Sequence, residues 1–252
     1  MHIVLQNINR LPASPELHEV HVYSMDFSLM LGCLSEFRKI LIEEEIDRAN
    51  RFHFEKDRNN FVLSRGILRI ILAHYLNKSP REIILHFNNY GKPFIREVKN
   101  IEFNLSHSKD KLLLAFTNNI PVGIDVEFMN ADFVKGDIAG KFFSPFEVSG
   151  LKKLPDELKI EGFYNCWTRK EALIKGIGKG LSIPLDSFDV ELIPGKTPAI
   201  FDMRFDIKEK GKWQIVDLKL HEEYKSALAL KSKNYKIKIF NISNCNLFLA
   251  DA

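Results

Sequence analysis

The chain has 252 residues, and 45% of them are hydrophobic, so a sizeable buried core is expected in one large domain or two smaller ones. Its 36 Lys and Arg residues are mixed with 33 Asp and Glu residues, which does not favour a nucleic-acid-binding protein. The longest apolar run, residues 67–76, contains Arg69 and His74 and is far shorter than the ~20 apolar residues of a membrane span, so no membrane association is expected. Three widely separated cysteines, without a Cys-x-x-Cys pair, favour reduced thiols and a cytoplasmic location.

Hydrophobic spacing and turn-forming residues divide the chain into predicted elements. In the first half, strands are expected at residues 18–23, 83–87, 101–105 and 112–117, and helices at residues 34–48 and 54–76. After a break at residues 118–121, strands are expected at residues 122–127, 188–192, 199–205, 212–220 and 224–230, with two short helices in residues 133–153 and a third helix at residues 162–176. Helices followed by strands thus occur on both sides of the break, which favours two similar α+β halves. The tail from residue 231 is typical either of a strand or of a poorly ordered end.

The helix predicted at residues 54–76 has a row of arginines on one face. Arg58, Arg65 and Arg69 follow one another at steps of seven and four residues, which is a helical spacing. Such a row is typical of a solvated helix surface or, alternatively, of a wall that faces phosphate groups. The residues alone leave both interpretations open.

Two carboxylates alternate with apolar residues in the strand predicted at residues 122–127. Because residues i and i+2 of a strand share a face, Ile124 and Val126 are expected to point into a core, with Asp125 and Glu127 on the other side. Two neighbouring carboxylates repel each other unless a cation lies between them, and Mg²⁺ prefers oxygen ligands of this kind. The alternative is an exposed strand edge with two solvated acids.

The helix predicted at residues 162–176 supplies a third acid. Glu171 and Lys175 stand four residues apart and therefore share a helix face. By itself this spacing is typical of a surface ion pair. The three glycines and the lysine between residues 176 and 180 favour a different interpretation, in which the backbone lies close to a ligand.

A histidine flanked by two serines follows the strand predicted at residues 101–105. A nucleophilic serine is disfavoured, because no Gly-x-Ser-x-Gly turn or orienting acid accompanies it. Ser106 and His107 are expected to bind a phosphate, unless His107 is a structural turn residue. Lys92, in a Gly-Lys-Pro turn, is another phosphate-binding candidate. The common nucleotide-binding folds are not supported, since neither a Walker A nor a Gly-x-Gly-x-x-Gly motif occurs.

Together these segments resemble the motifs of the 4′-phosphopantetheinyl transferases, in the long, pseudo-dimeric form that activates surfactin synthetase. The resemblance covers roughly residues 35–230, and the matching segments are Tyr-Gly-Lys-Pro at 90–93, Phe-Asn-Leu-Ser-His-Ser at 103–108, Val-Gly-Ile-Asp-Val-Glu at 122–127, Phe-Phe-Ser at 142–144, Trp-Thr-Arg-Lys-Glu-Ala-Leu-Ile-Lys at 167–175 and Gly-Lys-Gly-Leu at 178–181. The resemblance implies transfer of the phosphopantetheine arm of coenzyme A to a serine of an acyl or peptidyl carrier protein, with release of 3′,5′-ADP. The carrier would belong to fatty acid, polyketide or nonribosomal peptide synthesis.

The resemblance also implies an α+β fold, with two similar α/β subdomains related by a pseudo-twofold axis and the active site in the cleft between them. Residues 1–118 would form the N-terminal half, with the coenzyme A site and the Ser-His turn. Residues 119–230 would form the C-terminal half, with the metal-binding acids and the catalytic helix, and residues 231–252 a tail without an assigned role. A monomer is expected, because one chain supplies both halves of the site.

The same resemblance implies roles for individual residues. Asp125, Glu127 and Glu171 are expected to bind Mg²⁺. Glu171, or a water held by the acids, is expected to take the serine proton, and Lys175 to stabilise the phosphates and the departing ADP oxygen. The residues expected to bind coenzyme A are Arg48, Lys56, Lys92, Ser106, His107 and Lys175.

Two positions depart from the pattern of the family. Glu45 stands where lysine is frequent, and Phe61 stands where a small hydroxyl residue can occur. Both changes affect the expected site of the coenzyme A 3′-phosphate. Arg65 and Arg69 are candidates to compensate for them.

The protein is expected to recognise a carrier protein, and two other functions are possible alternatives. An acidic carrier protein suits a mildly basic enzyme with an apolar patch, for which Phe142, Phe143 and Phe146 are candidates, although such side chains are more often buried. One rival is a module that binds coenzyme A or a carrier without catalysis, and it would lack an acid or the lysine. The other is a nucleic-acid-binding protein, which would need clustered Lys and Arg with exposed aromatic residues.

Overall fold

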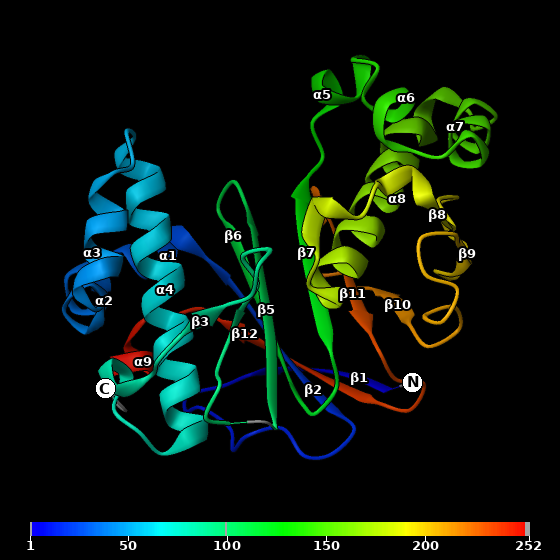
Figure 1. Ribbon diagram of the computed structural model, residues 1–252. Helices are drawn as coiled ribbons and strands as arrows, with labels where there is room; N and C mark the ends of the chain where they lie inside the picture. The colour runs from blue at the N-terminus through cyan, green and yellow to red at the C-terminus, as the bar shows by residue number, and fades with distance from the viewer. Residues whose placement is uncertain (1, 99, 250–252) are drawn as a thin grey trace.

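The computed structural model, which describes residues 2–98 and 100–249, has a mixed α/β fold with two main β-sheets (Figure 1). The strands are β1 (His2–Asn7), β2 (Glu19–Asp26), β3 (His86–Phe87), β4 (Pro93–Phe94), β5 (Ile101–Ser108), β6 (Lys111–Asn118), β7 (Val122–Phe128), β8 (Phe188–Val190), β9 (Ile200–Met203), β10 (Gln214–Asp217), β11 (Tyr224–Leu230) and β12 (Lys236–Ile242). The α-helices are α1 (Phe27–Met30), α2 (Leu34–Ile40), α3 (Glu43–Asn50), α4 (Glu55–Leu76), α5 (Ala131–Lys135), α6 (Ile138–Phe142), α7 (Pro145–Lys152), α8 (Asp156–Ile177) and α9 (Asn246–Leu249).

The larger sheet draws strands from both ends of the chain. Its order is β1-β12-β2-β6-β5, and β12 runs parallel to both of its neighbours while the other pairs are antiparallel. The part of the tail at residues 236–242 is therefore an inner strand of this sheet, followed by the short helix α9. Of the two interpretations of the tail, the strand is confirmed for these residues.

Helices cover one face of the larger sheet (Figure 1). Apolar side chains of α2, α4 and α9, among them Phe37, Ile71 and Phe248, share a buried cluster with Phe116 of the sheet. Helix α4 confirms the helix expected at residues 54–76. The helix expected at residues 34–48 is instead two helices, because the backbone is extended at Leu41 and Ile42.

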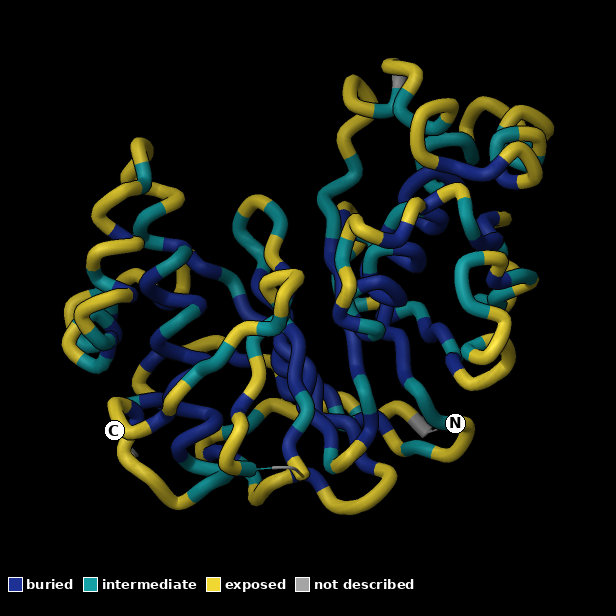
Figure 2. Tube along the Cα trace, in the orientation of Figure 1, coloured by how far each residue is buried: buried dark blue, intermediate teal, exposed yellow. Residues whose placement is uncertain are grey.

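The smaller sheet, in the order β10-β11-β7, has helix α8 on one face. Phe163 and Ile174 of α8 are buried against Ala227 of β11 and the ring of Trp213. The other face of this sheet packs against the larger sheet, since Ile124 and Leu228 share a third cluster with residues of β2, β6 and β12. Figure 2 shows the buried residues gathered in the strands and the inner faces of the long helices, with exposed residues along the outer loops.

A disulfide joins the tail to the N-terminal core. Cys33, at the end of the 3-10 turn Leu31–Cys33, is bonded to Cys245, which directly precedes α9, whereas Cys166 is free and buried. The expectation of three reduced cysteines is therefore wrong for this pair. Strand β12 brings the tail back beside the N-terminal helices, and a sequence separation of 212 residues conceals this proximity.

The helices of residues 2–98 and 100–249 include none that combines the length and the apolar character of a membrane span. The two long helices, α4 and α8, are each 22 residues long but carry several charged residues.

Candidate active site

Strand β7 carries two of the predicted acids and lies between β5 and helix α8. Ile124 and Val126 are buried in the cluster between the two sheets, as their alternation predicts. Asp125 and Glu127 have the opposite orientation, toward α8, where Asp125 contacts Lys175. The interpretation of these acids as a solvated strand edge is wrong for Asp125, which is only 1% exposed.

Gly123 allows α8 to lie directly on β7. A Cβ atom added at Gly123 would lie 2.0 Å from the carbonyl oxygen of Ala172 and 2.3 Å from the nitrogen of Gly176. Side chains of any size are excluded at such distances, so only glycine permits this contact between strand and helix. The contact brings Glu171 and Lys175, which are one helical turn apart, beside the acids of β7.

Asp125 is the centre of the polar contacts at this place. Its Oδ1 atom accepts hydrogen bonds from Ser106 Oγ at 2.8 Å and from Lys175 Nζ at 2.6 Å. Its Oδ2 atom is buried and has no hydrogen-bond partner. A buried carboxylate oxygen without a partner is costly for the free energy of folding, so this oxygen is suited to an additional ligand.

Burial and mutual repulsion change the protonation of the acids. Burial, and after it the charge of Asp125, raise the pKa of Glu127 from 4.5 to about 7, although Ser108 donates a hydrogen bond to Glu127 at 2.8 Å. The same two causes raise the pKa of Glu171. Burial opposes the charged form of Lys175, but Asp125, together with Glu171 and Glu127, outweighs burial and raises the lysine pKa.

These acids meet some requirements of a divalent cation and not others. Oxygen donors that repel one another, with the unpartnered Asp125 Oδ2 among them, fit the chemistry of Mg²⁺. In residues 2–98 and 100–249, however, no three His, Cys, Asp or Glu side chains are grouped closely enough to hold a metal ion. Lys175, by its ion pair with Asp125, supplies positive charge at this place.

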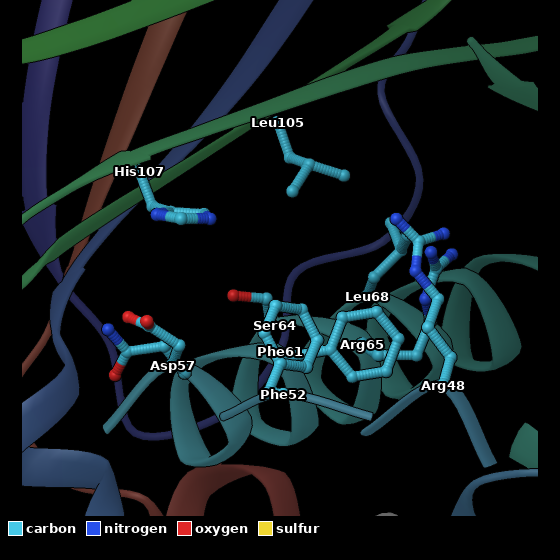
Figure 3. A pocket seen from close by; sticks show the side chains of 10 residues that line it. Arg48, Phe52, Asp57, Phe61, Ser64, Arg65, Leu68, Leu105 and His107 are labelled. Carbon is cyan, nitrogen blue, oxygen red and sulfur yellow. The ribbon is translucent and has the colours of Figure 1, made fainter. Parts of the chain in front are cut away.

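A cavity of about 270 Å³ lies between helix α4 and strand β5. Figure 3 shows Leu105 and His107 of β5 facing the side chains of α4 across it. The cavity is lined by Arg48, Phe52, Asp57, Asn60, Phe61, Ser64, Arg65, Leu68, Leu105 and His107. His107 and Arg48 are thus among the predicted coenzyme A residues that line this cavity.

Two polar atoms at this cavity have no partner. The Nη1 atom of Arg65 and the Oγ atom of Ser64 are buried without a hydrogen bond. The side chain of Arg65 is 10% exposed. Its guanidinium group lies 5.7 Å from the ring centroid of Phe61, and that of Arg48 lies 5.2 Å from it. Donors of this kind are suited to an anion. Ser64 was not anticipated from the sequence, and a serine in the middle of an apolar helical stretch was the available signal.

Glu45 contacts two arginines of α4, Arg65 and Arg69, and of these it hydrogen-bonds only Arg69. Its carboxylate accepts two hydrogen bonds from Arg69, at 2.7 and 3.0 Å, and lies 3.5 Å from Nε of Arg65. Arg69 is completely buried and also donates to the carbonyl oxygens of Pro80 and Ile83. Both interpretations of the arginine row are therefore wrong for Arg69, which has an internal partner, whereas Arg65 lines the cavity.

The remaining predicted residues lie around these two places. Lys56 is exposed in the first turn of α4, beside the cavity-lining Asp57. Lys92 donates hydrogen bonds to the carbonyl oxygens of Val122, at 3.1 Å, and Gly176, at 2.9 Å, and burial lowers its pKa. Lys92 therefore links the beginning of β7 to the end of α8, and it does not line the cavity.

The aromatic residues proposed for a partner surface divide into two groups. Phe143 is buried and belongs to the cluster under α8. Phe146, by contrast, is 60% exposed, and Phe142 is partly exposed beside the ring of Trp167. Only Phe142 and Phe146 of the three are accessible to a partner.

Comparisons with known proteins agree with this arrangement of motifs. Residues 32–119 match the family model described as 4′-phosphopantetheinyl transferase, N-terminal, and residues 121–231 match that of the 4′-phosphopantetheinyl transferase superfamily. The 4′-phosphopantetheinyl transferase HetI of Nostoc sp. is 31% identical over 238 residues, which are 92% of this chain and 97% of the relative. The 4′-phosphopantetheinyl transferase Sfp of Bacillus subtilis is 33% identical over 156 residues, 62% of this chain and 68% of the relative. The human L-aminoadipate-semialdehyde dehydrogenase-phosphopantetheinyl transferase is 29% identical over 206 residues, 75% of this chain and 66% of the relative.

The two family models together span most of the chain. HetI is matched over nearly its whole length. The chain therefore belongs to the 4′-phosphopantetheinyl transferases.

Proposed function

We propose that this protein transfers the 4′-phosphopantetheine arm of coenzyme A to a serine of an acyl or peptidyl carrier protein, in a reaction that depends on Mg²⁺. The observation that carries the proposal is the position of Asp125, whose buried Oδ2 atom lacks a partner while its Oδ1 atom binds Lys175. An acid in this state, in a chain of this family, is suited to a cation and a phosphate group.

The reaction replaces the phosphoanhydride bond of coenzyme A by a phosphate ester bond to the carrier serine. The carrier serine oxygen attacks the phosphorus next to the pantetheine arm, the bond from this phosphorus to the ADP oxygen breaks, and the serine proton leaves to a base. The products are the holo-carrier protein and 3′,5′-ADP. Asp125, Glu127 and Glu171 would hold Mg²⁺, which would supply positive charge to neutralise the pyrophosphate.

Glu171 and Lys175 have complementary roles in this proposal. Glu171, or a water that it holds, takes the serine proton, and its raised pKa supports a role as a base near neutral pH. Lys175 keeps its charge beside Asp125 and donates hydrogen bonds to the phosphates and the departing ADP oxygen. Its neighbour Ser106, 3.0 Å from the lysine nitrogen, orients it and contacts the same phosphates.

The nucleotide end of coenzyme A would occupy the cavity between α4 and β5. Arg48 and His107 line this cavity and are proposed to bind the coenzyme A phosphates. Lys56, which precedes the cavity-lining Asp57 in the chain, is proposed to bind them as well. Arg65 supports the proposal most strongly, because its Nη1 atom is buried without a partner. Arg65, which Glu45 contacts at 3.5 Å, is therefore proposed to compensate for the lysine that is frequent in the family at position 45. Lys92 is proposed to lie beside the adenylate end of coenzyme A and to act there by binding the backbone carbonyl oxygen of Gly176.

The two-part organisation belongs to the same proposal. Residues 1–118 and 119–230 would be similar halves about a pseudo-twofold axis, and each main sheet with its 22-residue helix supports this. The tail contributes β12 to the N-terminal half. A monomer is proposed, since the acids, the lysine and the cavity all come from one chain.

Intact-mass measurement of a carrier protein tests the function. The apo-carrier is incubated with coenzyme A, Mg²⁺ and either the wild-type protein or the Glu127→Gln variant. The wild type should add the mass of one phosphopantetheine arm and release 3′,5′-ADP, and the variant should add little. No added mass on fatty acid, polyketide and peptide carriers, with coenzyme A still bound tightly, would favour the non-catalytic binding module.

A further inference from the structure

The edges of the two main sheets meet without a backbone ladder. Strand β5 is an edge of the larger sheet and β7 an edge of the smaller one, and the two strands are in contact although they belong to different sheets. An edge strand presents N–H groups that need partners when they are buried. The N–H groups of β7 that point toward β5 therefore need hydrogen-bond acceptors other than a backbone ladder.

Side chains at every second position of β5 supply these partners. The N–H group of Ile124 donates to Asn104 Oδ1 at 2.9 Å, that of Val126 to Ser106 Oγ at 3.4 Å, and that of Phe128 to Ser108 Oγ at 3.1 Å. Alternate residues of a strand point to the same side, so the three side chains of β5 match the three N–H groups of β7 in step. We name this set of contacts the side-chain seam.

The two hydroxyl groups of the seam also reach the acids. Ser106 donates to Asp125 and Ser108 donates to Glu127, each at 2.8 Å. Each serine thus accepts from the N–H group of one residue and donates to the carboxylate of the residue before it. A backbone ladder would satisfy the same N–H groups but would leave the carboxylates without this contact.

We propose that Asn104 and Ser108 are positioning residues, which hold the acid-bearing strand β7 in the orientation that the phosphopantetheine transfer requires. This inference rests on the proposed function. Asn104 fixes the strand through the N–H group of Ile124, before the acids, and Ser108 fixes it after them while orienting the Glu127 carboxylate. Neither residue lines the cavity between α4 and β5.

The test measures the seam and the reaction separately. In Ser108→Ala, hydrogen exchange of the Phe128 amide, followed by NMR, should accelerate by about tenfold or more, because the amide loses its partner. The kcat for carrier modification should fall by roughly tenfold, and the KM for coenzyme A should change by less than kcat does, because Ser108 is outside the cavity and reaches the ligand only through Glu127. Ser108→Thr, which keeps the hydroxyl, should restore the exchange rate and kcat.

Ser226→Ala is the matched control. Ser226 is a buried serine of the neighbouring strand β11, and its hydroxyl donates to Leu218 within the smaller sheet rather than across the seam. This variant should leave both kcat and the Phe128 exchange rate unchanged. If Ser108→Ala does not fold, Ser108→Cys, of similar size but with weak hydrogen bonding, takes its place with the same expected direction.

Two results in Ser108→Ala would overturn the inference. An unchanged Phe128 exchange rate in Ser108→Ala would mean that the seam does not hold β7. Faster exchange with unchanged kcat would mean that the hydroxyl only covers a sheet edge. A wild-type protein without transfer activity would remove the proposed function and the positioning role together, whereas the exchange measurement would still judge the seam alone.

Discussion

Individual residues of the site are arranged at the expense of stability. Asp125 is buried with one oxygen unpartnered, and Glu127 next to it holds a proton more tightly than an exposed glutamate does. Groups with such shifts in pKa gather at functional sites, because a ligand of opposite charge relieves the strain. Both acids were predictable from the sequence, since strict alternation in a strand fixes which side chains share a face. The unpartnered oxygen was not, because it depends on the contacts of β7 with β5 and α8.

The raised pKa of Glu127 predicts a dependence of stability on pH. The pKa is 4.5 ordinarily and about 7 in the folded protein, so the folded protein binds the proton more tightly than the unfolded chain does. The cost of the carboxylate is therefore absent below pH 4.5, grows between these values and is complete above pH 7. Without metal, Glu127→Gln should stabilise the protein above pH 7, by up to about 3 kcal/mol, and not below pH 4.5. Thermal unfolding in a chelator measures this.

Glu209 provides the control for this measurement. Although burial opposes its ionisation, hydrogen bonds from Lys231 and Trp213 lower the pKa of Glu209 to about 2. Its carboxylate contributes stability above the unfolded pKa, so Glu209→Gln should destabilise the protein at neutral pH. Equal stability of the wild type and Glu127→Gln at every pH would contradict the account of the acids.

Among the elements, the pair of β7 and α8 decides the geometry of the site. The contact through Gly123 sets the distance between strand and helix, and it thereby places Glu171 and Lys175 beside Asp125. The sequence indicated both elements, because each carries a distinct motif. Their close contact was not predicted, because the glycines at residues 176–180 were interpreted as bringing the backbone close to a ligand and Gly123 was given no role.

Gly123→Ala tests the importance of this contact. The added Cβ would overlap the backbone of α8 at Ala172 and Gly176, which cannot move as a flexible side chain does. We expect a loss of about 3 kcal/mol or more in the free energy of unfolding, measured by urea denaturation, together with loss of carrier modification. Gly150→Ala, in helix α7, is the matched control. The added Cβ would meet only the side chain of Leu192, at 3.6 Å. It should be neutral or stabilise the protein by about 0.5–1 kcal/mol. Similar stability of the two variants would contradict the close contact.

In the whole molecule, contacts between distant segments were the hardest to predict. Strand β12 pairs with β1 and β2 from the far end of the chain, and its apolar pattern contains no information about its neighbours. The partner of Arg69 was hidden for the same reason, since Glu45 comes from another helix. The disulfide of Cys33 and Cys245 likewise depends on the return of the tail. Local sequence patterns thus predicted most helices and strands and the acids of the site. Contacts between segments far apart in the chain could be seen only in the folded structure.

The inner place of β12 predicts the effect of removing the tail. A chain that ends at Leu230 would leave β1 and β2 without the strand between them, and it would expose apolar residues of two clusters to water. We expect the shortened protein to lack cooperative unfolding, as followed by circular dichroism, because an inner strand is not replaceable by solvent. A control that ends at Leu249 should unfold like the full chain. A folded, active protein ending at Leu230 would contradict the topology.

We propose that the cavity between α4 and β5 and the acids of β7 bind one and the same ligand. Calorimetric titration of coenzyme A, with and without Mg²⁺, tests it directly in the wild type, Arg65→Ala and Glu127→Gln. We expect Mg²⁺ to strengthen binding to the wild type and Arg65→Ala to weaken binding by roughly tenfold or more under both conditions. Glu127→Gln should lose only the effect of Mg²⁺. Unchanged binding in Arg65→Ala, or an unchanged effect of Mg²⁺ in Glu127→Gln, would contradict a single site assembled from the two places.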